Sequence, residues 1–183
     1  AKSLLYHNIG QNDKVSIYSY NRKEWNYIYL ATQFINSAAV GIYHTSSSNE
    51  VEWVAGNSES KIIFVGNNPN DNQENDKMPI NRLLEALPKL KNVELVVTLP
   101  EVTSSGNSKI ISWDKFIENG KSIESSKVLD LPSKIKDDHT SSLIYTSGTT
   151  GNPKGVELVH KNWNFLMDAL STCLLYTSDA ADD

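Results

Sequence analysis

The sequence predicts an α/β domain built on a largely parallel sheet. Segments with strand character and segments with helix character alternate four times, which is the order that a parallel sheet with crossover helices requires. Residues 61–66, Lys-Ile-Ile-Phe-Val-Gly, form a continuous apolar run, as expected for a strand buried on both faces. The 183 residues are enough for one domain with its own core.

The first strand and the first helix are expected in residues 14–35. Val15 and Ile17 alternate with polar residues over 14–20, which indicates a strand. Asn21 with Glu24 three residues later has the pattern of a capping box, so we expect a helix from there to about residue 35. Its buried side is expected to carry Trp25, Ile28, Tyr29 and Ala31.

The same order continues through the rest of the chain. Residues 38–43 predict a strand, and Ser47 with Glu50 predicts a second capping box before a helix over 49–56. After the strand at 61–66 we expect a polar loop at 67–77, a helix at 80–87 ended near Pro88, a strand at 92–99, a loop at 103–108, a helix at 112–119 with Asp114 near its start, a polar surface segment at 122–138 and a strand at 141–146.

Charge and composition exclude several classes of protein. The formal net charge is −5 and only Arg22 and Arg82 are arginines, so a broad nucleic-acid-binding face is not expected. No apolar run reaches the ~20 residues of a membrane span. The sequence begins with Ala1 and has no signal-type segment, so we expect it to start inside a longer chain.

The last eleven residues, 173–183, have a different origin in our interpretation. Cys-Leu-Leu-Tyr-Thr-Ser-Asp-Ala-Ala-Asp-Asp matches at every position the translation of a common transposon-type sequencing adapter. We therefore expect a non-native tail, and a natural protein that continues beyond Thr172. The tail holds the single cysteine, Cys173, and three of the 22 acidic residues, so residues 1–172 have a formal net charge of −2 and no thiol chemistry.

Residues 146–155, Thr-Ser-Gly-Thr-Thr-Gly-Asn-Pro-Lys-Gly, have the composition of a phosphate-binding loop. Glycines let backbone amides approach an anion closely, and successive amides form an anion-binding nest. The hydroxyl groups add donors, and Lys154 adds a positive charge. The loop does not have the Walker spacing or a G-x-G-x-x-G pattern, and residues 156–159 after it favour a strand. We therefore expect a loop between two strands, with a helix that starts near His160; a P-loop NTPase is disfavoured, and a flexible linker is the plain alternative.

The stretch Tyr-Thr-Ser-Gly-Thr-Thr-Gly-Asn-Pro-Lys-Gly-Val with His160 after it resembles the signature loop of the adenylate-forming superfamily. Upstream, residues 17–25, 45–53 and 58–65 resemble the amino-terminal region of long-chain fatty acid–CoA ligases, enzymes of fatty acid metabolism. The resemblance covers nearly all of residues 1–172. It implies the amino-terminal part of the adenylate-forming fold, within an AMP-forming, ATP-dependent acyl-CoA ligase.

The resemblance also implies a two-step reaction. A carboxylate attacks the α-phosphate of Mg-ATP to give acyl-AMP and pyrophosphate, and the thiol of coenzyme A then displaces AMP. The loop would hold the β- and γ-phosphates, as pyrophosphate develops as the leaving group. The phosphate-binding residues implied are Thr146, Ser147, Gly148, Thr149, Thr150, Gly151 and Lys154. Tyr145 and Pro153 would shape the strand and the loop.

The resemblance has departures and gaps. His44 and Glu157 stand where such ligases often have proline and an apolar residue. The adenine site with its metal-binding glutamate, the ribose-binding aspartate and the late catalytic lysine all lie downstream in the family. We therefore expect no catalytic residue and no metal ligand in this chain, and expect the chain alone to be inactive. The expected substrates are a fatty acid, ATP with Mg²⁺, and coenzyme A.

Other polar residues have plainer interpretations. A histidine without a visible partner is usually surface or core, and this holds for His44 and His139; His160 is either a site residue or the start of a helix. The four tryptophans, Trp25, Trp53, Trp113 and Trp163, are expected to be core or half-buried. Asp137 and Asp138 are expected in a solvated turn, because adjacent side chains in an extended chain point in opposite directions.

Two alternatives stay open. One is another adenylating enzyme that activates an aryl or amino acid, and the other is a nucleotide-binding module without catalysis. We expect a cytoplasmic protein; peripheral membrane association, acyl chain length and oligomeric state are not readable from these residues.

Overall fold

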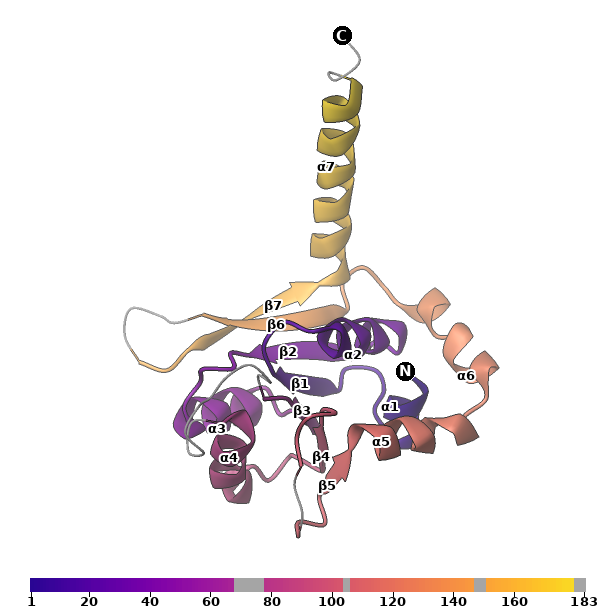
Figure 1. The fold of residues 1–183 in the computed structure, drawn as a ribbon. Helices are drawn as coiled ribbons and strands as arrows, with labels where there is room; N and C mark the ends of the chain where they lie inside the picture. Colours follow the sequence, from indigo (N-terminus) through magenta and orange to yellow (C-terminus); the bar gives the residue numbers. More distant parts are fainter. Residues whose placement is uncertain (68–77, 104–105, 147–150, 180–183) are drawn as a thin grey trace.

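The computed structural model of the protein describes residues 1–67, 78–103, 106–146 and 151–179. Within these ranges the strands form one seven-stranded sheet in the order β5-β4-β3-β1-β2-β6-β7 (Figure 1). Every neighbouring pair of these described strands is parallel except β6 and β7, which are antiparallel. The predicted α/β class with a mostly parallel sheet is confirmed.

The elements follow one another along the chain as strand and helix. The strands are β1 (Lys14–Tyr18), β2 (Ala38–Ile42), β3 (Ile62–Val65), β4 (Leu95–Thr98), β5 (Ile110–Ser112), β6 (Thr140–Thr146) and β7 (Lys154–Val159). The helices are α1 (Lys2–Tyr6), α2 (Lys23–Phe34), α3 (Ser48–Asn57), α4 (Pro79–Ala86), α5 (Trp113–Asn119), α6 (Ser125–Leu129) and α7 (His160–Asp179). Three short 3-10 helices are η2 (Leu87–Lys89), η3 (Gly120–Ser122) and η4 (Pro132–Lys134).

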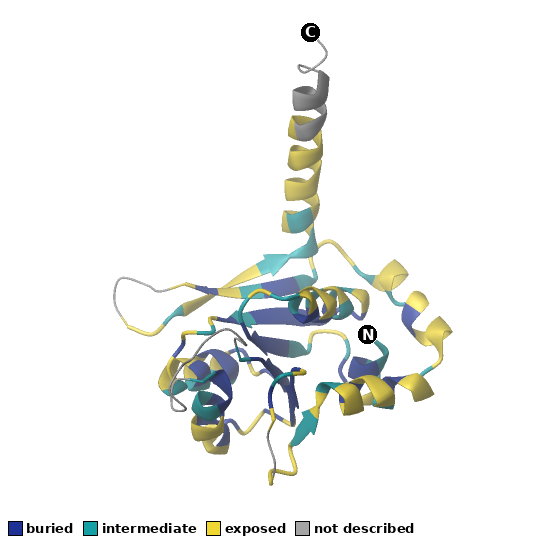
Figure 2. Cartoon of the chain, in the orientation of Figure 1, coloured by how far each residue is buried: buried dark blue, intermediate teal, exposed yellow. Residues whose placement is uncertain are grey.

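The sheet is covered on both faces, and each face has its own apolar core. Ile63 and Val65 of β3 belong to the core under α3 and α4, whereas Ile62 and Phe64 belong to the core under α1, α2 and α5. Successive side chains of a strand point to opposite faces, so a strand in this position must be apolar at every residue. This explains the continuous apolar run at 61–66. Figure 2 shows the central strands as the most buried part of the molecule.

Two of the predicted helix ends are confirmed by their hydrogen bonds. Ser47 is the N-cap of α3: the Glu50 amide donates to the Ser47 hydroxyl at 3.4 Å, and the Ser47 amide donates to the Glu50 carboxylate at 2.7 Å. α4 ends at Ala86, and Pro88 lies in η2 immediately after it. Both signals are local, because each is read within three or four residues.

The capping box predicted at Asn21 is wrong. Arg22 is the N-cap of α2, and its side chain makes no capping hydrogen bond. The Glu24 carboxylate accepts from the Arg22 guanidinium at 2.7 Å. A charge-assisted hydrogen bond of this kind is stronger than a neutral capping bond, so Glu24 turns toward Arg22.

Three short elements are missing from the sequence prediction. They are α1, β5 and α6, of three to five residues each. Elements of this length carry no readable periodicity, and tertiary contacts stabilise them: Leu4 of α1 is buried and β5 pairs with β4. Most of the loop predicted at 67–77, and residues 104–105 of the loop predicted at 103–108, lie outside the described residues.

The helix predicted to start near His160 is present and has 20 residues. α7 extends away from the sheet and is exposed over most of its described length (Figures 1 and 2). It continues through residues 173–179, so the boundary expected at Thr172 is not marked by a helix end. No helix among the described residues has the length and apolar character needed to cross a membrane.

Candidate functional site

The signature loop connects β6 and β7, as predicted. The two strands are antiparallel, with Thr146 opposite Lys154 at the end of the ladder. Thr146 and the described residues 151–154 therefore lie at the open end of a hairpin (Figure 1). Both ends of the loop are thus fixed by two hydrogen-bonded strands.

The structure brings three of the predicted phosphate-binding residues together at this tip. Thr146 ends β6, Lys154 begins β7, and both side chains are exposed. Gly151 has φ +91° and open space around its Cα, a backbone conformation that favours glycine. Ser147, Gly148, Thr149 and Thr150 lie outside the described residues.

The described part of the tip has the chemistry of an anion site. A hydroxyl donor at Thr146 and a mobile ammonium at Lys154 flank a loop in which glycine permits close approach of backbone amides. Over the described ranges, no group of three His, Cys, Asp or Glu side chains lies close enough to hold a metal ion. Mg²⁺ that binds together with a nucleotide takes most of its ligands from phosphates and water, so no step is assigned to it here.

Helix α3 lies against both strands of the hairpin. The Tyr145 hydroxyl donates to Asn57 Oδ1 at 2.7 Å, and Trp53 Nε1–H donates to the Pro153 carbonyl at 2.8 Å. Tyr145 is 5% exposed, and burial raises the pKa of its hydroxyl. Its ring passes Gly155 so closely that a Cβ there would be 3.0 Å from Tyr145 Cζ. Tyr145 and Pro153 thus have the structural positions that were expected.

The expectation that Trp53 is core or half-buried is wrong. Its side chain is 37% exposed, while Trp25, Trp113 and Trp163 are half-buried as expected. The sequence analysis also did not identify Asn57. Trp53 and Asn57 are four residues apart and share one face of α3, but this spacing does not reveal what the face contacts.

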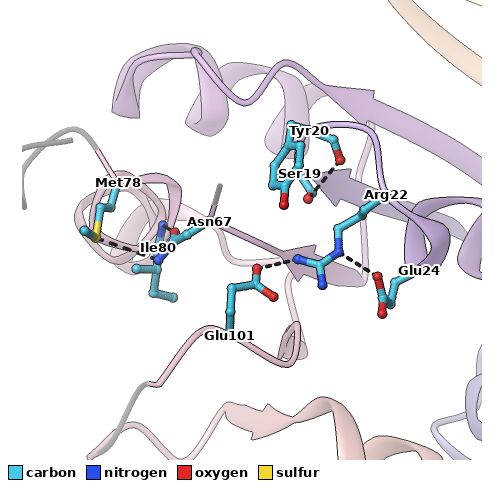
Figure 3. A network of polar contacts seen from close by, with 8 residues as sticks. All are labelled: Ser19, Tyr20, Arg22, Glu24, Asn67, Met78, Ile80 and Glu101. Atoms are coloured by element: carbon cyan, nitrogen blue, oxygen red, sulfur yellow. Dashed lines mark hydrogen bonds and ion pairs between the residues drawn. The ribbon is translucent and has the colours of Figure 1, made fainter. Parts of the chain in front are cut away.

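A second polar cluster lies at the carboxyl ends of β1, β3 and β4 (Figure 3). The Arg22 guanidinium bonds Glu24 at 2.7 Å and also bonds Glu101. β1 and β3 are neighbours whose following helices, α2 and α4, lie on opposite faces, and open α/β sheets commonly bind ligands at such a point. Here the two carboxylates satisfy the arginine, and a cavity of about 410 Å³ beside it is lined by Asn21, Arg22, Trp25 and Asn26.

The histidines have structural surroundings. His139 Nδ1 is 2.7 Å from Asn36 Nδ2, and the His44 ring meets the Tyr20 ring edge-on. His160 starts α7 at the far end of β7, about 20 Å from Lys154 at a strand rise of ~3.3 Å per residue. Burial and then the charge of His139 lower the pKa of His160, against an opposing effect of Asp137.

The predicted solvated turn at 137–138 is confirmed. Both aspartates are exposed, and Asp137 Oδ1 accepts a hydrogen bond from Asn164 Nδ2 at 3.2 Å. Neither carboxylate is part of the hairpin tip.

Comparison with known proteins gives matches over nearly the whole chain. A family model described as AMP-binding enzyme matches residues 1–183. A long-chain-fatty-acid–CoA ligase of Xenopus laevis is 32% identical over 162 residues, which are 88% of this chain and 21% of the relative. The corresponding human ligase is 32% identical over 171 residues, which are 93% of this chain and 24% of the relative. The chain thus spans about a quarter or less of the length of these curated relatives.

Solved structures share the fold. The anthranilate–CoA ligase AuaEII in complex with anthranoyl-AMP superposes with a TM-score of 0.68 at 18% identity, over 88% of this chain and 28% of that one. Acetoacetyl-CoA synthetase from Streptomyces lividans superposes with a TM-score of 0.70 at 18% identity, over 86% of this chain and 23% of that one. At this identity the likeness establishes the fold alone.

Proposed function

The chain belongs to the family of AMP-binding enzymes, and from this premise we propose that it is the amino-terminal part of an ATP-dependent, AMP-forming ligase of fatty acids and coenzyme A. The observation that supports the proposal is the hairpin tip, where Thr146, Gly151 and Lys154 flank a loop rich in hydroxyl groups and glycine. We include Ser147, Gly148, Thr149 and Thr150 in the same phosphate-binding loop.

In the proposed reaction the loop binds the β- and γ-phosphates of ATP. The fatty acid carboxylate attacks the α-phosphorus, the bond from the α-phosphorus to the bridging oxygen breaks, and pyrophosphate leaves with its electron pair. The Lys154 ammonium and the loop donors stabilise the negative charge that develops on pyrophosphate. The coenzyme A thiol then attacks the acyl carbon of acyl-AMP and displaces AMP; its proton goes to solvent or to a base outside the described residues.

The choice of a long-chain fatty acid as substrate is supported by the named relatives at 31–32% identity. The fold likeness to aryl- and acetoacetyl-CoA ligases supports the reaction type and not the acid. An aryl- or amino-acid-activating enzyme is therefore the alternative that the substrate test must exclude.

The test is acid-dependent exchange between pyrophosphate and ATP in the full-length parent protein. We expect exchange with long-chain fatty acids, and much less with anthranilate or amino acids. Replacing Lys154 by alanine should lower kcat/KM for ATP by about 100-fold, the typical effect of removing one group that stabilises transition-state charge. Exchange with aryl or amino acids alone would select the alternative, and no exchange with any acid would favour a non-catalytic nucleotide-binding module.

We further propose that residues 1–172 are a partial domain and that 173–183 are not native. The 183-residue chain by itself should then show no acyl-dependent exchange, because the relatives are about four times longer. Exchange by the purified chain contradicts this. Adapter-free sequencing across codon 172 tests the tail directly: a frame that continues without residues 173–183 supports the proposal. A cytoplasmic location stays a prediction that cell fractionation tests.

A further inference from the structure

The hairpin that carries the phosphate-binding loop is weakly supported by the sheet itself. β6 is paired with β2 only at Ser142 and Leu143, whereas its ladder with β7 continues to the pair Thr146 and Lys154. β7 has no further strand beside it in the described sheet. From Ile144 onward the hairpin is thus a two-stranded ribbon, and such ribbons are marginally stable and strongly twisted on their own.

Two side chains of α3 hold this ribbon, one on each strand. Asn57 Oδ1 accepts the hydrogen bond of the Tyr145 hydroxyl on β6, and Trp53 Nε1–H donates to the carbonyl of Pro153, the residue before β7. We call Trp53 and Asn57 the α3 anchor. Gly155, opposite Tyr145 in the ladder, leaves the space that the Tyr145 ring crosses to reach Asn57.

Helix α3 is a firm base for these contacts. Val51 and Ala55 are fully buried in the core, and the capping box closes the first turn. Lys89 Nζ bonds Glu52 at 2.8 Å and joins α3 to the segment after α4. Because α3 is held in this way, Trp53 and Asn57 on its exposed face have fixed positions, and so do the hairpin residues that they bond.

We propose that Trp53 and Asn57 are positioning residues for ATP, which fix the place of Lys154 and of residues 151–153 before it. The proposal rests on the proposed function of the loop. The hydrogen bond to the Pro153 carbonyl lies one residue from Lys154, so it determines where the lysine side chain begins. Misplacement of a binding group by about 1 Å is enough to weaken transition-state contacts severely.

The test uses the double variant Trp53→Phe/Asn57→Ala in the full-length parent. Both hydrogen bonds are lost while the ring and the helix are kept. We expect KM for ATP to rise about tenfold in the exchange reaction, with KM for the fatty acid within twofold of the wild-type value. Asn57→Asp keeps the accepting oxygen. It should therefore reverse most of the increase in KM for ATP that Asn57→Ala causes, and bring KM back toward the wild-type value.

The matched control is Trp113→Phe/Asn119→Ala, the same two substitutions on α5 under the other face of the sheet. It should lower stability without a selective change in KM for ATP. Equal ATP kinetics for the α3 and α5 variants, or parallel losses in kcat and in both KM values, overturns the proposal.

Amide hydrogen exchange on the 183-residue chain separates the α3 anchor from the proposed function. The amides of Lys154 and Gly155 should exchange at least about tenfold faster in the α3 variant than in the α5 variant, because the ribbon opens locally more often. Equal exchange rates show that α3 does not hold the hairpin and overturn the inference. Faster exchange in the 183-residue α3 variant, together with a full-length parent that activates no acid, would support the α3 anchor and reject the proposed function.

Discussion

Arg22 lies between two carboxylates at the carboxyl edge of the sheet. Glu24 is 4% exposed, and Glu101 comes from the segment after β4, so one guanidinium joins two connections of the sheet. Burial by itself would raise the pKa of the Glu24 carboxyl, but the hydrogen bond and charge of Arg22 outweigh burial and lower that pKa. The ionised form of Glu24 is therefore part of the folded state.

Replacing Glu24 by glutamine should destabilise the protein by about 1.5–3 kcal/mol at pH 7, the range for hydrogen bonds to charged groups. The folded-state pKa is lowered, so the contribution of Glu24 is present above its unfolded pKa of about 4.3 and is lost as the pH falls through the folded-state value. Urea unfolding between pH 3 and pH 7 measures this contribution. The difference in unfolding free energy between the variant and the wild type should become smaller as the pH falls.

Glu118→Gln is the control for this pH effect. Glu118 is 62% exposed and 3.7 Å from Lys115, and exposed pairs contribute about 0–1 kcal/mol. A similar loss in both variants, or a loss at Glu24 that does not depend on pH, contradicts the assigned role of Arg22.

Gly66 is the point of closest approach in the same region. A Cβ at this position would lie 2.7 Å from Leu99 Cδ1 and 2.7 Å from Ser19 Oγ. We expect Gly66→Ala to cost about 1–3 kcal/mol through overpacking. Gly10→Ala is the matched control, because no heavy atom lies within 4 Å of its added Cβ. Equal unfolding free energies of the two variants would show that the space around Gly66, just after β3, is larger than these distances indicate.

At the scale of elements, α3 supports both the core and the hairpin. Its first turn depends on the Ser47 hydroxyl, and its inner face buries Val51, Val54 and Ala55. Loss of an N-cap side chain costs about 0.5–2 kcal/mol, because an amide of the first turn loses its acceptor.

Ser47→Ala should therefore lower the free energy of unfolding by that amount, as measured by urea denaturation. It should also speed amide exchange in residues 48–51 more than in α5. Ser126→Ala serves as the control, since it is an exposed serine inside α6. An unchanged α3 in the Ser47 variant would mean that packing alone determines where the helix begins.

At the scale of the whole molecule, two cores lie on the two faces of one sheet and α7 extends beyond both. His160 and Trp163 are half-buried at its start, and the Trp163 ring meets the Tyr29 ring edge-on at 6.2 Å. Further along, Phe165 is 75% exposed. The described contacts of α7 with the rest of the chain are thus concentrated in its first turns.

A non-native tail should contribute little to stability. Since each kcal/mol corresponds to about 2–4 °C at this size, deletion of residues 173–183 should leave the melting temperature within about 2 °C of the full chain. Deletion of residues 160–183 should lower it clearly, since Trp163 and His160 are then lost. Calorimetry measures the melting temperatures of the full chain and of the two deletion variants. A large loss from the shorter deletion would contradict the proposal that residues 173–183 are not native.

Much of the fold could be predicted from short stretches. The strands at β1, β2, β3 and β4, the Ser47 cap and the hairpin around the loop were all readable, because each depends on periodicity or chemistry within a few residues. The predicted cap at Asn21 was wrong, because Glu24 bonds Arg22 instead, and Arg22 is also held by Glu101, which is 79 residues away in the sequence. Trp53 was misread for the same reason: its partner, Pro153, is 100 residues away.

By itself, the sequence determined the alternation of strands and helices, the apolar run of β3 and the hydroxyl, glycine and lysine chemistry of the loop. Only the tertiary structure decided the strand order, the pairing of Arg22 with two carboxylates and the contact of α3 with the hairpin. The physical reason is distance along the chain. Backbone preference and amphipathic spacing act within one or two turns, whereas these contacts join segments that only the crossover connections bring together.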